Sequence, residues 1–180
     1  MTDLNPDDLN KKGKKAFKNK KFAEAGELFQ AAAARYAELD DFISAAEAAN
    51  NWSVAALKSG NPELSIQAVE GTPELFLEAG DLQRAGLAYG NLATAQEELN
   101  LVDEACLNYE RSADLLKQAG DQDNRLHVMQ ALSALQLRTG KQFQALATMQ
   151  AGLNGISKLS PKQRFLRKLL TVPNKYLTGS

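Results

Sequence analysis

A repeat of forty residues, which runs along the chain without gaps, constrains the fold more than any other feature of the sequence. Three columns at this spacing hold only Gly, Ala, Ser or Thr: Gly13, Ser53, Ala93 and Ser133; Ala25, Ser65, Ala105 and Ala145; Ala32, Thr72, Ser112 and Gly152. Small side chains at fixed places leave room for two helices to cross closely in a densely packed interior. Such self-similarity predicts stacked supersecondary units, each contacting its neighbours, rather than one globule.

Within each repeat the apolar residues follow the period of an α-helix. Phe22, Ala25, Phe29, Ala32 and Tyr36 form one stripe at i, i+3 and i+4 spacing. Gly, Asp, Asn and Pro separate the stripes, and these residues end one helix and begin the next. We therefore expect no strands, and helices over 7–19, 22–39, 42–59, 62–79, 82–99, 102–119, 122–139 and 142–159.

These helices pair into hairpins, which the sequence places at 6–40, 41–80, 81–120 and 121–159, after a flexible start at 1–5. A hairpin buries only one face of each helix, so neighbouring hairpins must stack. The predicted fold class is therefore all-α, a right-handed superhelical solenoid of four helical hairpins. Gly71 and Pro73 fall inside the helix expected over 62–79, where they predict a kink or a break with Thr72 as the cap of a second segment.

A further amphipathic helix is expected over 160–172, beginning at Ser160 and Pro161. Its apolar face would consist of Phe165, Leu166, Leu169 and Leu170. We expect this helix to cap the open end of the solenoid. The alternative is a basic amphipathic helix that binds a membrane or a partner, and residues 173–180 are expected to be a flexible tail.

Charge is distributed unevenly, although the net charge is only −1. Residues 11–21 contain seven Lys and no acid, residues 22–157 carry a net charge of −11, and residues 158–180 contain six bases and no acid. The lysines are either simply solvated or form electropositive patches, Lys11–Lys21 and Lys162–Lys168, for peripheral contact with an acidic surface. The acidic centre argues against specific binding of nucleic acid.

Candidates for catalysis or metal binding are few. His127 is the only histidine and Cys106 the only cysteine, so neither a histidine pair nor a cysteine cage is available for a metal. We expect no catalytic residue, no metal and no cofactor. The polar start of the chain and the absence of an apolar run of about 18 residues predict a cytoplasmic protein.

The segment KGKKAFKNKKFAEAGELFQAAA, residues 12–33, resembles the tetratricopeptide repeat (TPR), and the resemblance extends over residues 6–159. The usual TPR period is about 34 residues, whereas forty-residue versions look like the soluble attachment proteins of vesicle fusion. The resemblance implies a non-catalytic adaptor that binds a peptide or protein in a concave groove. The alternatives are a membrane-surface adaptor that uses the basic ends, and a HEAT-like scaffold. The oligomeric state is left open.

The same resemblance implies that the first helix of each hairpin lines the groove. Asn51 and Asn91 lie forty residues apart on these helices, and amides can donate to and accept from the backbone of an extended peptide. The alternative is that these amides are only solvated. The predicted groove residues are Asn10, Lys14, Asn50, Asn51, Asn91, Thr94, His127, Gln130 and Arg138.

Overall fold

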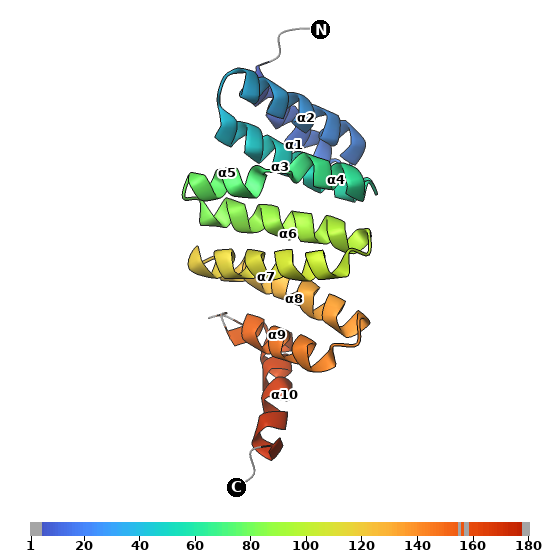
Figure 1. Ribbon diagram of the computed structural model, residues 1–180, viewed down its shortest axis with the longest axis vertical. Coiled ribbons are helices and arrows are strands. Elements are labelled where there is room, and N and C mark those ends of the chain that lie inside the picture. The colour runs from blue at the N-terminus through green and yellow to red at the C-terminus, as the bar shows by residue number, and fades with distance from the viewer. Residues whose placement is uncertain (1–4, 155, 157–158, 178–180) are drawn as a thin grey trace.

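The computed structural model describes residues 5–154, 156 and 159–177. The first helices of the hairpins are α1 (Pro6–Lys18), α3 (Phe42–Lys58), α6 (Leu82–Glu98) and α8 (Gln122–Arg138). The second helices are α2 (Phe22–Glu38), α4 (Pro62–Val69) with α5 (Thr72–Glu78), α7 (Val102–Gln118) and α9 (Gln142–Asn154), and α10 (Pro161–Leu177) follows. Consecutive helices pack side by side along one axis (Figure 1). The described residues contain no strand, and the predicted all-α solenoid of hairpins is confirmed.

A left-handed residue at every twentieth position sets the length of the helices. These residues, with φ between 57° and 79°, are Lys20, Asp40, Gly60, Gly80, Asn100, Gly120 and Gly140. The next residue donates its N–H to a carbonyl five residues back, as Asp81 does to Phe76 at 2.8 Å, which is the bond of a Schellman turn. The turns inside and between hairpins are therefore alike, and only some of them carry the glycine that marks them in the sequence.

Aspartates begin three of the four first helices. The carboxylates of Asp41, Asp81 and Asp121 each accept the N–H three residues further on, at 2.9 to 3.1 Å. The N–H of Arg84 is the main reason why the pKa of Asp81 lies below its ordinary value. The expected N-terminal caps of α3, α6 and α8 are therefore present.

The single helix expected over 62–79 is broken into α4 and α5. Gly71, with a φ of 74°, is the N-cap of α5, and Pro73 falls in its first turn, where the missing N–H costs nothing. The hydroxyl of Thr72 donates back to the carbonyl of Val69 at 2.9 Å. The expected break is present, but the expectation that Thr72 caps the second segment is wrong, because Gly71 is the N-cap and Thr72 is already the first residue of α5.

The small columns lie where the two helices of a hairpin cross, and all their members are buried. In the second hairpin, Ser53 and Ser65 are fully buried and share a hydrogen bond of 2.7 Å. In the fourth hairpin, Ser133 donates to the carbonyl of Ala145 at 2.8 Å. The sequence therefore fixes the crossing points, because a larger side chain at either place would separate the helices.

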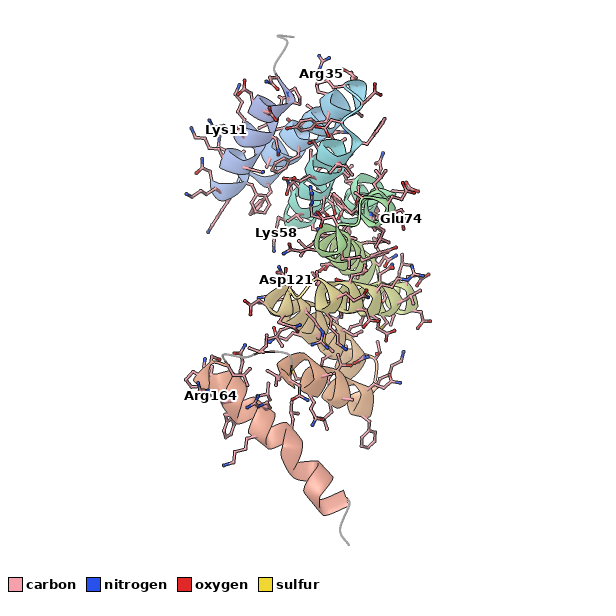
Figure 2. All side chains as sticks on the ribbon, turned by 90° about the vertical axis from the view of Figure 1, so that its left-hand side faces the viewer. Lys11, Arg35, Lys58, Glu74, Asp121 and Arg164 are labelled. Atoms are coloured by element: carbon pink, nitrogen blue, oxygen red, sulfur yellow. The ribbon has the colours of Figure 1, made fainter. Side chains whose placement is uncertain are left out.

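α10 crosses α9 and leads away from the stack (Figures 1 and 2). Leu166 and Leu170 pack with Leu126 of α8 and Leu153 of α9, and this cluster covers the end of the last hairpin.

Three expectations about the C-terminal region differ from the structure. α9 ends at Asn154 rather than at 159. Phe165 does not share the packed face but is 69% exposed, and the side chain of Leu169 lies outside the described part. α10 continues to Leu177, so residues 173–177 are helical instead of belonging to a flexible tail.

Candidate functional site

The first helices α1, α3, α6 and α8 form one face of the solenoid, which we call the first-helix face. Two hollows open on this face, one between α6 and α8 and one between α1 and α3. Both are placed by the repeat, because each is lined by a first helix, by the second helix of its own hairpin and by the following first helix.

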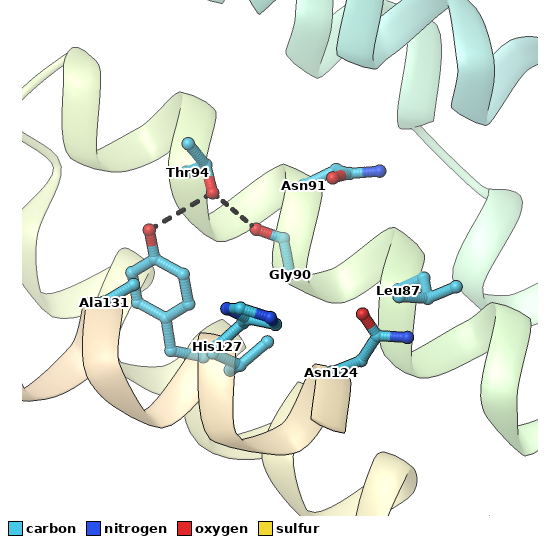
Figure 3. Close-up of a pocket in the computed structure, with 9 residues that line it drawn as sticks. Leu87, Gly90, Asn91, Thr94, Asn124, His127 and Ala131 are labelled. Carbon is cyan, nitrogen blue, oxygen red and sulfur yellow. Dashed lines mark hydrogen bonds between the residues drawn. The ribbon is translucent and has the colours of Figure 1, made fainter. Parts of the chain in front are cut away.

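The α6–α8 hollow is lined by both apolar and polar residues of α6, α7 and α8 (Figure 3). Its lining residues are Leu87, Gly90, Asn91, Thr94, Tyr109, Asn124, His127, Val128 and Ala131. Thr94 donates to the carbonyl of Gly90 at 2.9 Å, and its hydroxyl oxygen lies 3.2 Å from the Tyr109 hydroxyl. The imidazole of His127, by contrast, is exposed and makes no hydrogen bond within the described residues.

The tyrosine of this hollow is buried and hydrogen-bonded. Tyr109 is only 2% exposed and donates to a carboxylate oxygen of Glu97 at 2.7 Å. Loss of solvation is the main reason why the pKa of Tyr109 is raised well above its ordinary value. The hollow therefore presents amide and hydroxyl groups and the imidazole of His127 beside Leu87 and Val128, and no carboxylate or amine lines it, which suits an uncharged side chain.

The α1–α3 hollow differs in charge. Its lining residues are Lys14, Phe17, Phe29, Asn51 and Val54. The amine of Lys14 lies 3.5 Å from a carboxylate oxygen of Glu47, and Asn51 makes no hydrogen bond within the described residues. Three apolar walls with an amine and an amide at the rim suit a side chain that has an apolar stem and an acidic head.

The two hollows occupy equivalent places in the repeat. Lining residues of one are eighty positions from lining residues of the other: Lys14 and Thr94, Phe29 and Tyr109, Asn51 and Ala131. In both cases the hollow lies between a first helix, the middle of its second helix and the following first helix. The hollows are therefore one structural niche that appears in the first hairpin and again in the third.

Polar bridges occupy the space between α3 and α6, which separates the hollows. Asn91 donates its amide N–H to the amide oxygen of Asn50 at 2.8 Å. Arg84 lies 3.3 Å from the second carboxylate oxygen of Glu47. These bonds join α3 to α6 and leave the two hollows as distinct places on the same face.

The predicted groove residues fall into three groups. Lys14, Asn51, Asn91, Thr94 and His127 line the hollows, and Asn50 forms the bridge between them.

The remaining three residues lie in neither hollow. Arg138 is paired with Glu97 at 2.5 Å, and Gln130 is half-buried. The amide oxygen of Asn10 is buried and has no hydrogen-bond partner among the described residues.

Sequence reasoning missed Phe29 and Tyr109 as lining residues, because both belong to a repeated core column and were assigned to packing alone. It also missed Asn124, whose side chain is held at the rim of the α6–α8 hollow by a bond of 2.7 Å to Asp121. The forty-residue register could have linked Phe29 with Tyr109, because both occupy the same column of the repeat.

The predicted basic regions lie at opposite ends of the molecule. Figure 2 shows Lys11 on α1 and Arg164 on α10, far apart along the long axis. The lysines of residues 11–21 are all exposed, although Lys21 is paired with Glu24 at 3.0 Å. The two regions therefore do not form one continuous patch on a single chain.

The described residues contain no group of three or more His, Cys, Asp or Glu that could hold a metal ion. Cys106 is half-buried, and loss of solvation raises the pKa of its thiol above the ordinary value, which makes it a poor nucleophile. Among the helices that the structure describes, none has both the length and the apolar composition needed to cross a membrane.

Comparison with known proteins agrees with this architecture. The family model described as soluble NSF attachment protein, SNAP, matches residues 5–172. Among solved structures, the chain is similar to the TPR-like repeats of a candidate kinesin light chain from Podosopora anserina, with 12% sequence identity, 96% of each chain covered and a TM-score of 0.52. No curated protein matches. The structural likeness shows a TPR-like fold, and the predicted resemblance is confirmed.

Proposed function

Since this chain belongs to the soluble NSF attachment protein family, we propose that it binds an extended segment of a partner protein along the first-helix face. The family and the TPR-like fold are those of protein-interaction adaptors that are generally without catalytic activity. The identity of the face and the form of the ligand are our proposal, which we argue from the geometry of the hollows.

The observation that carries the proposal is the recurrence of one niche in hairpins one and three. Helices packed directly on each other lie about 8–10 Å apart, and successive first helices contact each other less closely than they contact second helices. Niches two hairpins apart are therefore separated by at least roughly 20 Å. Because an extended chain advances about 3.3 Å per residue, one segment would place two side chains in the hollows when they are at least about six residues apart.

The lining of each hollow sets the preference for its side chain. Lys14 and Asn51 favour an acidic side chain in the α1–α3 hollow, where the seven lysines of residues 11–21 add a positive field. Asn91, Asn124 and His127 favour a neutral side chain in the α6–α8 hollow. The ligand is thus an extended peptide with an acidic anchor and a neutral, partly apolar anchor.

Selection of peptides from a displayed random library on the purified chain, followed by affinity measurements, tests this proposal. Asn51→Ala and His127→Ala remove no hydrogen bond within the described residues and should leave stability within about 0.5 kcal/mol. Each should weaken a selected peptide, whereas Gln118→Ala, an exposed amide on α7, should not. Selected peptides that bind all three variants equally would place the site elsewhere.

A second candidate function, membrane-surface adaptor, is favoured by the exposed bases at both ends of the chain. Lysines on α1 and bases on α10 would attract anionic lipid, with salt weakening the binding. Sedimentation with anionic vesicles tests this function on the full chain and on a variant lacking residues 160–180. If α10 is chiefly a cap, deletion of residues 160–180 lowers the melting temperature. If the membrane adaptor is right, the deletion leaves the melting temperature unchanged and abolishes sedimentation with the vesicles.

A further inference from the structure

An apolar stripe is exposed on α9, the second helix of the last hairpin. Phe143 is 89% exposed and Leu146 is 40% exposed, and Ala147 beside them is exposed as well. These residues are spaced at i, i+3 and i+4 and therefore share one face of the helix, which we call the α9 stripe. None of them lines either hollow of the first-helix face, so the stripe is separate from the proposed peptide site.

The repeat shows what normally packs on this face of a second helix. The equivalent residues of α2 are Ala23, Gly26 and Glu27. They line a hollow together with Asn61 and Leu64, which lie at the start of α4. This face of a second helix is therefore turned toward the second helix of the following hairpin.

The α9 stripe has no following second helix. α7 repeats the arrangement of α2, because Asp103, the equivalent of Phe143, lies 4.0 Å from Lys141 at the turn before α9. α10 comes after α9, but it packs with Leu153 on the buried face of that helix. Within the described residues, the α9 stripe is therefore an open end of the stack.

The α9 stripe also differs in composition from the same positions elsewhere. Each of the other second-helix rows contains a carboxylate, which is Glu27, Glu63 or Asp103. Among the helices that the structure describes, α9 alone contains no charged residue. The terminal unit of a solenoid needs a polar outer face where it meets water, so an uncharged apolar stripe at this place is typical of a surface that another molecule covers.

The opposite end of the stack, formed by α1 and α2 (Figure 1), is polar. α3 packs on the preceding hairpin through Ala48, Trp52 and Ala55. The equivalent residues of α1, all of them exposed, are Asp8, Lys12 and Lys15. Head-to-tail stacking would bury these charges against apolar side chains, which costs their solvation. Of the two ends of the stack, the α9 stripe therefore matches only another α9 stripe.

We propose that the α9 stripe binds the α9 stripe of a second copy of this chain about a two-fold axis. A two-fold contact places the same surface of both molecules face to face. Charges of one sign would repel each other in such a contact, and the stripe has none. The contact uses up the stripe of both copies, so it gives a dimer rather than longer chains. Both first-helix faces stay free, and the dimer carries two peptide sites.

Sedimentation velocity of the full chain, from micromolar to millimolar concentration, tests the proposal. Three side chains bury less than the roughly 800 Å² per partner of a standard interface, so the dimer should be weak and form only at the higher concentrations. Residues 158–180 of both copies are basic and the stripe is uncharged, so added salt should leave the dimer unchanged or strengthen it. Phe143→Ala, which removes the exposed ring, and Leu146→Asp, which places an unpaired carboxylate in the contact, should each weaken the dimer by about tenfold or more.

Phe42→Ala is the matched control, because Phe42 is 52% exposed on α3 and lies outside the stripe; it should leave the dimer unchanged. If Leu146→Asp lowers the melting temperature, Ala147→Asp replaces it, since Ala147 is exposed. A wild type that stays monomeric up to millimolar concentration, or a dimer that survives Phe143→Ala, would overturn the proposal. Assemblies larger than a dimer, or a dimer that high salt dissociates, would equally contradict it.

Discussion

The same substitution should have different effects on stability at two glycines of the first hairpin. Gly13 lies inside α1 and Gly26 inside α2, and replacing a helical glycine with alanine stabilises a helix by about 1 kcal/mol. At Gly26 the new Cβ would be 3.5 Å from Trp52, an ordinary contact. Gly26→Ala should therefore be more stable than the wild type.

At Gly13 the packing opposes the gain in helix propensity. A Cβ there would lie 2.7 Å and 2.8 Å from two ring carbons of Phe29, which is 2% exposed, so the buried ring or α1 itself must shift to admit the methyl group. Overpacking of this kind costs about 1–3 kcal/mol, which equals or exceeds the helical gain. We expect the free energies of unfolding of Gly13→Ala and Gly26→Ala to differ by about 1–3 kcal/mol, with Gly13→Ala the less stable.

Urea denaturation followed by circular dichroism measures this difference. A difference of 1 kcal/mol corresponds to about 2–4 °C in melting temperature for a chain of this size, so thermal melts give an independent value. Equal stabilisation by both substitutions would refute the argument, because it would mean that the Phe29 ring does not pack on α1 as described.

Three further predictions concern the crossings and the caps. Ala105→Leu should destabilise the fold by about 1–3 kcal/mol, because Ala105 is fully buried at a helix crossing; a melting temperature equal to that of the wild type would contradict the register. Ser53→Ala should cost about 1–3 kcal/mol by leaving the hydroxyl of Ser65 without its partner, whereas the double Ser53→Ala/Ser65→Ala variant should recover most of that stability in urea titrations. Asp81→Ala should cost about 1 kcal/mol at pH 7, and because the pKa of Asp81 is lowered in the fold, this difference should shrink as the pH falls below 3.8.

The sequence predicted the hairpins well because their register depends on residues that repeat. Ala93 and Ala105 are fully buried where the forty-residue columns place them, and a small residue at a crossing has a local steric reason. The turns at Lys20 and Asn100 were harder to identify, because a Schellman turn can tolerate a non-glycine residue with positive φ.

The site was predictable only in part, since a hollow depends on what neighbouring helices leave unfilled. Asn51 and His127 could be placed on the first helices from the repeat, and both line hollows. That Asn91 would be partly engaged with Asn50 could not be foreseen, because the bond crosses between hairpins. The exposure of Phe165 was likewise hidden, because it depends on the direction in which α10 leaves the stack.

The central claim is that the first-helix face is the binding site. Hydrogen exchange of the chain with and without a selected peptide tests this claim most directly. Backbone amides at the rims of the two hollows, on α1, α3, α6 and α8, should exchange more slowly when the peptide is bound. Amides of the second helices α2 and α7 that face away from the hollows should be unchanged. Protection confined to α10 or to the second helices would contradict the claim.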